Sequence, residues 1–311
     1  MKSISIVVLT YNGLSLLRKN LPVLHRVAET RSHQVELIVV DNGSTDGTAE
    51  FLREYFPSAK VQRIESNTGF AEAVNRGVYA AQRDLVLVIS NDVLVGEDMF
   101  GAPLAKFDDP AVFSVTPNMI DPRDGNSQAI PRLVPGICWF RTRFLQLADV
   151  QSLEGEIPIF YGSGGASFYD REKLLFLGGF DTVYHPFYVE DVDLAYRAWK
   201  AGWKCLLEPS VTVFHETSST IRSLHTKRKI KFLGDRNRHL FLWLNITDPY
   251  LIIRYALFLP LSMLYDIITF RKYKFVGFFR ALRYLPRLPA LRKKRKAYFK
   301  VTDREVFTSI C

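Results

Sequence analysis

Short strand-like segments alternate with helix-like segments over the first 90 residues, and this alternation constrains the fold more than any other feature of the chain. The strand-like segments are 4–9, 35–40, 60–64 and 84–89. The intervening helix-like segments are 14–28, 44–56 and 69–82. Such alternation is typical of βαβ units, because two parallel strands need a crossover connection between them. We therefore predict an α/β protein with an open, mostly parallel sheet.

Polar residues follow each of these four strands. The strand-end groups are Thr10-Tyr11-Asn12, Asp41-Asn42-Gly43-Ser44, Ser66-Asn67-Thr68-Gly69 and Ser90-Asn91-Asp92. Polar residues also make ordinary turns. In parallel α/β sheets, however, ligands bind beyond the carboxyl ends of the strands. The carboxylates of Asp41 and Asp92 at two such ends therefore favour a binding site over simple turns.

A second polar cluster lies in the segment HPFYVEDVDLAYRAWKAG, where Glu190, Asp191 and Asp193 stand among aromatic and aliphatic residues. Burying like charges so close together is costly unless they are paired or bind a metal. The spacing predicts a helix over 191–201 that stops at the following glycine. Asp193 then faces away from Asp191, and we predict that it pairs with Arg197 one helical turn later.

Several common ligand motifs are missing from the sequence. It contains neither the GxGxxG dinucleotide fingerprint nor the P-loop GxxxxGK[ST]. The run DNGSTDGT resembles a calcium loop, but the position that needs a terminal Glu is Leu52. These absences exclude classical dinucleotide, P-loop and EF-hand sites.

Cysteine usage and the N-terminus bear on the compartment. The three cysteines, Cys138, Cys205 and Cys311, are far apart and include no CxxC pair, so we expect no disulfide or zinc site and a reducing environment. The apolar run near the N-terminus is too short for a signal peptide, and no small-residue cleavage site follows it. We therefore expect a cytosolic protein.

Four segments together resemble the family 2 glycosyltransferases, especially bacterial members related to rhamnosyltransferases. They are SIVVLTYNG, ELIVVDNGSTDGT, NTGFAEAVNRG with VLVISND, and GGFDTVYHPFYVEDVDLAYRAWKAGW. The similarity covers about residues 3–245, and it implies a GT-A (Rossmann-like) domain over 1–245. Residues 1–110 would form its nucleotide-binding half and 111–245 its acceptor half. Residues 246–311 would form a separate C-terminal helical segment.

The resemblance also implies the nucleotide and metal sites. The nucleotide-binding residues it assigns are Thr10, Tyr11, Asn12, Asp41, Asn67, Gly69, Asn75 and Asn91. The family's DxD metal motif is Ser90-Asn91-Asp92 in this chain, so only Asp92 supplies its carboxylate. His215 matches the family's additional histidine, although a strand-end histidine satisfied by hydrogen bonds is the alternative. The implied cofactor is Mg²⁺ or Mn²⁺, with oxygens of a diphosphate completing its coordination.

The carboxylate cluster matches the position of the family's catalytic pair. Asp191 would be the general base that deprotonates the acceptor hydroxyl in an inverting transfer, and Glu190 would position acceptor or sugar. The alternative for Asp191 is a plain helix N-cap. For the whole protein, the alternatives are a non-catalytic scaffold and a nucleotidyltransferase, for which the loop TYNGLS lacks the expected arginine.

The resemblance implies a nucleoside-diphosphate-sugar donor and a lipid-linked or polysaccharide acceptor in bacterial surface-glycan synthesis. Deoxythymidine-diphosphate (dTDP) rhamnose is the favoured donor, and UDP- and GDP-sugars are the alternatives. The Gln/Arg-x-x-Arg-Trp motif of processive relatives is missing from residues 231–245, which argues for addition of one or a few sugars. Arg236 and Arg238 in this segment would contact phosphate or be solvated.

The C-terminal segment carries the basic character of the chain. Residues 271–300 contain twelve Lys or Arg and no Asp or Glu, so the rest of the chain has a net charge of −3, which is +9 less +12. Residues 250–270 are long and apolar enough to span a membrane, but they include Arg254, Pro260 and Asp266, which argues against a clean span. We expect helices on the inner face of the cell membrane. An oligomer contact is the alternative, and we expect no nucleic-acid partner.

Overall fold

The computed structural model describes residues 2–29, 35–134, 141–146, 150, 153, 155–215 and 226–310. Its strands are β1 Ile4–Thr10, β2 Val35–Asp41, β3 Lys60–Arg63, β4 Leu85–Ser90, β5 Val93–Leu94, β6 Val112–Ile120, β7 Asn126–Val134, β8 Arg141–Gln146, β9 Ile157–Pro158, β10 Ala166–Asp170 and β11 Lys204–His215. Its α-helices are α1 Leu14–Glu29, α2 Thr48–Tyr55, α3 Phe70–Ala80, α4 Gly101–Ala105, α6 Arg171–Phe176, α7 Glu190–Lys200, α9 Lys227–Asn245, α10 Pro249–Ile268, α11 Lys272–Leu282, α12 Leu288–Lys296 and α13 Asp303–Ile310.

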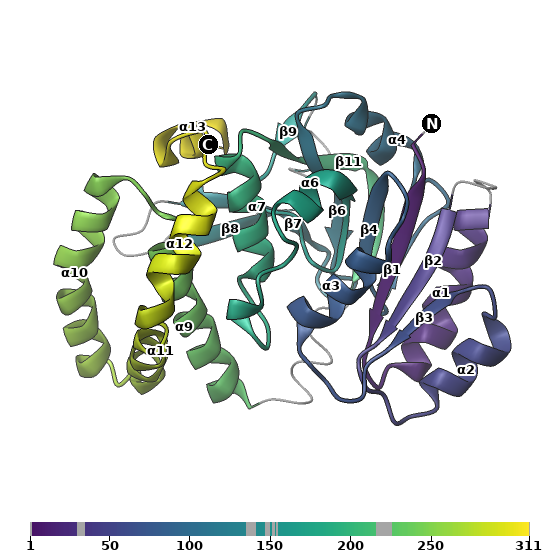
Figure 1. Cartoon of the computed structure of the whole chain (residues 1–311), viewed down its shortest axis with the longest axis horizontal. Helices are drawn as coiled ribbons and strands as arrows, with labels where there is room; N and C mark the ends of the chain where they lie inside the picture. Colours follow the sequence, from purple (N-terminus) through teal and green to yellow (C-terminus); the bar gives the residue numbers. More distant parts are fainter. Residues whose placement is uncertain are drawn as a thin grey trace.

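The strands form a central sheet with the order β3-β2-β1-β4-β10-β6-β11-β5 (Figure 1). The pairs β3–β2, β2–β1, β1–β4 and β6–β11 are parallel, which confirms the predicted mostly parallel sheet. Strand β10 runs antiparallel to both of its neighbours. Its first residue therefore lies at the edge of the sheet where β1 and β4 end. This reversal brings the glycine-rich segment before β10 to the ligand-binding edge.

The core forms where apolar strand faces meet helices on both sides. Strand β4 is buried on both faces, as its β-branched sequence predicts for an interior parallel strand. The predicted apolar face of α1 is confirmed, with Leu17, Leu21 and Leu24 buried. Helix α3 approaches the sheet closely, because a Cβ atom at Gly77 would lie 2.3 Å from Val7.

The second predicted helix starts later than expected. The sequence placed it over 44–56, but α2 begins at Thr48. The side chain of Asp46 instead accepts hydrogen bonds from the backbone N–H groups of Leu14 and Thr48. Gly47 adopts a φ of 89°, a left-handed conformation that suits glycine and separates this loop from the helix. The loop thereby joins the ends of β1 and β2 and does not extend α2.

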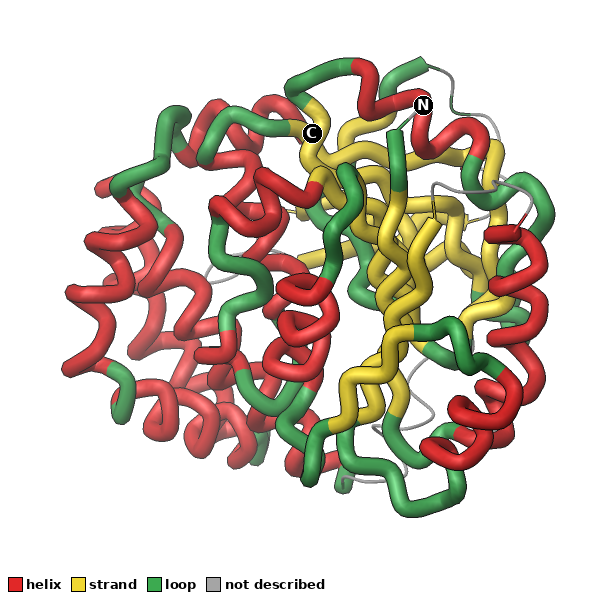
Figure 2. The backbone as a smooth tube through the Cα atoms, turned by 45° about the vertical axis from the view of Figure 1, so that its right-hand side comes forward, coloured by secondary structure: helices red, strands yellow, loops and turns green. Residues whose placement is uncertain are grey.

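Helices α9 to α13 gather beside the sheet, at the left of Figure 1, and the same group appears in red at the left of Figure 2. Helix α12 contacts α9, and α13 contacts α7. The chain between α12 and α13 is fixed to α7, because the N–H groups of Lys300 and Val301 donate to the carbonyl of Lys200. The last helices therefore return to the helix that carries the carboxylate cluster.

Candidate active site

The loops after β1 and β2 hold each other through side chain–backbone hydrogen bonds. Ser44 accepts from the N–H of Asn12 at 2.9 Å, and the Asn12 side chain accepts from the N–H of Thr45 at 2.8 Å. Asp41 is fully buried and accepts from the N–H of Ser44 through Oδ1. Its Oδ2 is buried and has no hydrogen-bond partner among the described residues. Asp41 thus keeps an acceptor free beside the turn that holds Tyr11 and Asn12.

The loop after β3 is joined to the turn that precedes α7. The backbone N–H of Gly69 donates to the side-chain oxygen of Asn67, and the carbonyl of Thr68 lies 3.0 Å from Nδ1 of His185. Gly69 has a φ of 82°, and a Cβ atom there would lie 2.8 Å from the carbonyl oxygen of Pro186. The Gly69 position therefore needs glycine, and it brings the predicted nucleotide loop against the predicted catalytic segment.

Asn91 and Thr10 meet at the neighbouring strand ends. The side chain of Asn91 donates to Oγ1 of Thr10 at 2.8 Å, and the carbonyl of Asn91 accepts from Asn20. A Cβ atom at Gly13 would lie 1.9 Å from the Asn91 amide. Asn91 is therefore packed flat against the first loop and orients the segment that leads to Asp92.

Asp92 and His215 face each other across the ends of β4 and β11. Nε2 of His215 lies 3.4 Å from Oδ1 of Asp92, and this buried oxygen has no hydrogen-bond partner among the described residues. The side chain of Gln128 donates through Nε2 to the carbonyl of His215, so its Oε1 faces Nδ1 of the same residue at 3.0 Å. Because Oε1 can only accept, Nδ1 carries the proton. Nε2 is then free to bind a cation.

This donor set fits a divalent cation. A lone pair on Nε2 of His215 and the carboxylate of Asp92 repel each other unless a proton or a metal ion lies between them. The amide of Gln128 fixes the imidazole in the way that outer partners fix metal-binding histidines. No group of three or more His, Cys, Asp or Glu side chains converges in the described part of the chain. Asp92 and His215 would therefore supply only two ligands, and a bound diphosphate would have to complete the set.

The carboxylate pair sits at the first turn of α7 on a strained backbone. Tyr188 and Val189 have φ values of 72° and 80°, which are unfavourable for residues with side chains and for a β-branched valine above all. The side chain of Asn237 donates to the carbonyls of Tyr184, Phe187 and Tyr188 at 2.7 to 3.0 Å. Helix α9 thus holds the strained turn in place, and the strain positions Glu190 and Asp191.

The two carboxylates differ in their affinity for a proton. Burial, together with the charge of Asp191, raises the pKa of Glu190 to about 8. Burial raises the pKa of Asp191 to about 6, while N–H groups including those of Val192 and Gly164 oppose the rise. Asp191 is therefore the more acidic of the two and loses its proton first. Carboxyl pairs whose pKa values are pushed apart in this way are common at functional sites.

The glycine loop before β10 touches both halves of the site. The backbone N–H of Gly164 lies near the carboxylate of Asp191 and lowers its pKa. A Cβ atom at Gly165 would lie 3.4 Å from Cε1 of His215. The carbonyl of Gly165 accepts from the N–H of Ser90 at the end of β4. Asp191 and the Asp92–His215 pair therefore flank the same two-glycine loop.

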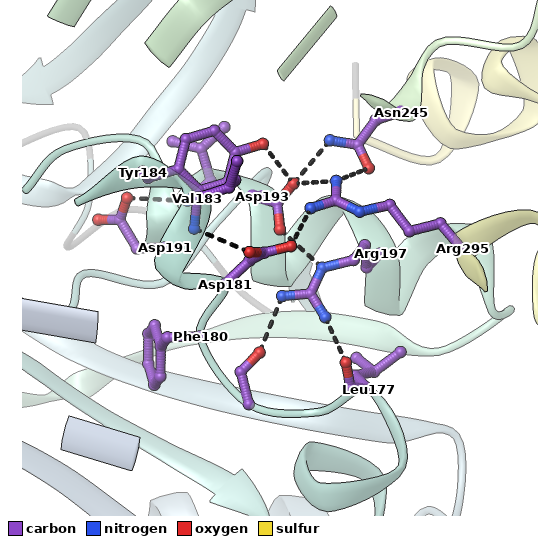
Figure 3. A network of polar contacts seen from close by, with 12 residues as sticks. Leu177, Phe180, Asp181, Val183, Tyr184, Asp191, Asp193, Arg197, Asn245 and Arg295 are labelled. Carbon is purple, nitrogen blue, oxygen red and sulfur yellow. Dashed lines mark hydrogen bonds and ion pairs between the residues drawn. The ribbon is translucent and has the colours of Figure 1, made fainter. Parts of the chain in front are cut away.

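Asp193 has a different role, as predicted. Its carboxylate pairs with Arg197 at 2.6 Å, which confirms the predicted contact, and also with Arg295 at 2.5 Å (Figure 3). The hydroxyl of Tyr184 and the amide of Asn245 donate to the same carboxylate. Burial alone would raise the pKa of Asp193, but the charges of Arg295 and Arg197 outweigh it and hold the pKa at about 2. Sequence reasoning missed Arg295, which it placed in an exposed basic segment.

Asn75, Arg236 and Arg238 also have defined partners. Asn75 donates to and accepts from the backbone of Phe180, so it fixes the segment before α7, and its contact with a nucleotide stays a prediction. Arg236 is buried and donates to the carbonyls of Tyr184 and His185, so a solvated Arg236 is wrong. Arg238 is half exposed and pairs with Asp235.

Comparison with known proteins places this geometry in a family. The model of glycosyl transferase family 2 matches residues 5–176. N-acetylglucosaminyl-diphospho-decaprenol L-rhamnosyltransferase of Mycobacterium tuberculosis is 30% identical over 263 residues, which cover 75% of this chain and 84% of the relative. Poly-beta-1,6-N-acetyl-D-glucosamine synthase of Staphylococcus epidermidis is 26% identical, and the match covers 78% of this chain and 62% of that protein.

Solved structures share the fold. GalNAc-T7 with UDP, GalNAc and Mn²⁺ has a TM-score of 0.64 at 17% identity, covering 80% of this chain and 49% of that chain. The mannosyltransferase PcManGT from Pyrobaculum calidifontis, with GDP-Man and Mn²⁺, has a TM-score of 0.57 at 18% identity, covering 96% and 74%. These likenesses confirm the predicted GT-A fold.

Proposed function

The chain belongs to glycosyl transferase family 2 and is rhamnosyltransferase-like, and from this we propose that it is a metal-dependent, inverting hexosyltransferase. It moves a sugar from a nucleoside-diphosphate sugar to a lipid-linked or polysaccharide acceptor in bacterial surface-glycan synthesis. The observation that carries the proposal is the meeting of Asp191 and the Asp92–His215 pair at the Gly164–Gly165 loop. Transfer of a sugar needs a base for the acceptor hydroxyl and a cation for the leaving diphosphate, and these groups lie on either side of one small loop.

The chemistry follows from the state of each group. The ionised carboxylate of Asp191 takes the proton of the acceptor hydroxyl as its oxygen attacks the anomeric carbon. The bond from that carbon to the diphosphate oxygen breaks, and one displacement inverts the anomeric centre. Glu190, which holds its proton more tightly than Asp191, orients a sugar oxygen as a hydrogen-bond donor. Asp92 and His215 would hold Mg²⁺ or Mn²⁺, which when bound neutralises the charge of the leaving diphosphate.

We assign the nucleotide to the loops after β1, β2 and β3. The buried and unpaired Oδ2 of Asp41 suits the ring N–H of a thymine, uracil or guanine base. Thr10, Tyr11, Asn12, Asn67, Gly69 and Asn91 surround the same strand ends, and Asn75 stays in the proposal as part of the pocket wall. We favour dTDP-rhamnose as donor because the mycobacterial relative is named a rhamnosyltransferase. UDP- and GDP-sugars remain the alternatives, since the structural relatives hold UDP and GDP-Man.

We expect nucleotide binding to depend on the cation and on Gln128. In titrations of dTDP, UDP and GDP, one nucleotide should bind the wild type with Mn²⁺ and bind far more weakly without it. Asp92→Ala should abolish the effect of Mn²⁺, because it removes the only carboxylate of the cation pair. Gln128→Leu should weaken Mn²⁺ binding by about 10–100-fold, because the imidazole of His215 loses the partner that orients it.

Gln82→Leu serves as the matched control for Gln128→Leu, since Gln82 is exposed and remote from the cation pair in the sheet. It should bind nucleotide and Mn²⁺ as the wild type does. Equal Mn²⁺ affinity for Gln128→Leu and the wild type would refute the orienting role of Gln128. Mn²⁺-independent binding of every nucleotide would refute the cation site itself.

A lipid-linked acceptor would confine this reaction to a membrane. The mycobacterial relative is named for a decaprenol-linked substrate. We therefore propose that the protein is cytoplasmic and peripheral at the inner face of the cell membrane.

A further inference from the structure

Helix α10 has an apolar face that nothing covers in the described part of the chain. The helix is long and apolar enough to cross a membrane, with a mean hydropathy of 1.7, and only 6% of that stretch is buried. Ile253, Leu257, Leu261, Leu264 and Ile268 form a stripe along it at helical spacing, and each is more than half exposed. We call this stripe the outer face of α10. A helix of a soluble protein normally turns such a stripe inward.

Two polar residues of α10, Tyr255 and Asp266, point toward the neighbouring helices. Asp266 is buried and pairs with Lys274 of α11 at 2.9 Å. The hydroxyl of Tyr255 lies 2.7 Å from Nδ1 of His239 on α9. Arg254, the other charged residue of this helix, is half buried. The orientation of α10 is therefore fixed by polar contacts with its neighbours, and the outer face is apolar because of that orientation.

Basic residues surround this apolar face. Residues 271–300 contain twelve Lys and Arg, of which eight are exposed among those whose side chains the structure describes, and this segment has no acidic residue to offset them. The exposed ones are Arg271, Arg280, Arg283, Arg287, Lys293, Lys294, Lys296 and Lys300. Figure 1 shows α10 as the outermost helix, beside α11 and α12. An apolar stripe next to a basic surface is complementary to the acyl chains and headgroups of an anionic bilayer.

We propose that the outer face of α10 lies in the plane of an anionic phospholipid bilayer and does not span it. A spanning α10 would have to leave α11 and α9, which would break the Asp266–Lys274 ion pair and the Tyr255–His239 hydrogen bond. Both sets of polar groups would then face hydrocarbon. In the in-plane orientation these contacts stay intact and only apolar side chains enter the lipid.

A second copy of the chain fits this face less well than lipid does. A twofold contact through α10 would bring two basic segments together, each with the eight exposed cations and no acidic residues in 271–300. Their repulsion opposes such a dimer, whereas anionic headgroups neutralise it. Helix α9 connects α10 to the site, since Asn237 holds the turn before α7. The bilayer would thus be held at a fixed place relative to Asp191, which matters if the acceptor is lipid-linked, as proposed above.

The test is flotation of the full chain with vesicles of phosphatidylglycerol and phosphatidylcholine in equal parts. The wild type should float with these vesicles. The double variant Leu257→Glu/Leu261→Glu should bind about a hundredfold more weakly or worse, because two apolar anchors are replaced by charges. Lys293→Gln, Lys294→Gln and Lys296→Gln together should weaken binding by about fivefold for each lysine removed. Tyr55→Glu, a similar change on the exposed surface of α2, should bind as the wild type does.

Depth measurements separate an in-plane helix from a spanning one. Tryptophans introduced as Ile253→Trp and Leu264→Trp should be quenched alike by lipids brominated at one chain position, since both lie at the same shallow depth. Unequal quenching that places one of them at the bilayer centre would overturn the in-plane orientation. Failure of the wild type to float, or a dimer that the double variant dissociates, would overturn the bilayer as occupant. Titration of nucleotide against the double variant shows whether its nucleotide site is intact. A loss of vesicle binding can thereby be told apart from a failure of the proposed function.

Discussion

Asp191→Asn should lower kcat by about 10²–10⁴-fold while leaving the fold and nucleotide binding intact. The substitution removes the charge that accepts the acceptor proton but keeps an oxygen that can accept from the N–H group of Val192. Glycosyl transfer at saturating donor and acceptor, measured beside urea unfolding, checks both parts of the expectation. If unfolding in urea is unchanged, the lower kcat reflects the chemical step and not a less stable α7.

The pH dependence should identify Asp191 as the group that titrates. Burial raises the pKa of Asp191 to about 6, and only its ionised form can act as a base. The rate should therefore rise with pH through about 6 and be lost below it, because the proton that adds there occupies the basic oxygen. In Asp191→Asn this rise should disappear.

Glu190→Gln is the matched control, because it changes the adjacent carboxyl in the same way. Glu190 holds its proton more tightly than Asp191, so replacing its acid with a neutral amide should cost less activity than Asp191→Asn. A larger loss of activity for Glu190→Gln than for Asp191→Asn, or near-normal activity for Asp191→Asn, would show that Asp191 is not the general base.

Arg295→Met should destabilise the protein by about 3–5 kcal/mol, the largest stability effect we expect from one substitution. Arg295 is 3% exposed, and it pairs with both Asp193 and Asp181 at 2.5 Å. Removing the guanidinium leaves two carboxylates beside Arg197 alone, with Asp193 fully buried. Urea unfolding should show a lower midpoint with little change in slope.

Lys294→Met controls for loss of a cation from the same helix. Lys294 neighbours Arg295 in sequence but is exposed, so its loss should change stability by no more than about 0.5 kcal/mol. Similar midpoints for Arg295→Met and Lys294→Met would show that the buried network contributes little. Similar midpoints would also indicate that the packing of α12 through Arg295 adds little to stability, as expected of a peripheral basic segment.

The local patterns of the sequence predicted the first four strands, β1 to β4, and the loops that follow them well, whereas β5 to β9 were not predicted. Strand β1 and the apolar face of α1 match their predicted segments closely, because the spacing of apolar residues in each segment matches the positions that are buried. The i,i+4 pair of Asp193 and Arg197 was predictable for the same reason, since both residues lie on one helix. The later start of α2 could not be predicted from the neighbouring residues, because the side chain of Asp46 accepts a hydrogen bond from the N–H of Leu14, which is distant in sequence.

Contacts between distant segments were beyond sequence reasoning. Nothing near Gln128 indicates that its amide meets His215, and nothing in the basic run around Arg295 marks that one cation as buried. The reversed direction of β10 was equally hidden, because a short apolar strand carries no sign of its direction. Asp92, Asp191 and His215 were named from the family resemblance, and the structure brings all three to one glycine loop. Cys138 and Cys311 lie outside the described residues, and Cys205 is a buried free thiol.

The stereochemistry of the product tests the central claim most directly. Transfer from dTDP-rhamnose, or from the sugar of whichever nucleotide binds, can be followed to completion with a lipid-linked acceptor by nuclear magnetic resonance. The account predicts a glycosidic bond with the anomeric configuration opposite to that of the donor, formed only when Asp191 is intact. A product that retains the donor configuration, or no transfer from any nucleotide sugar that binds, would contradict it.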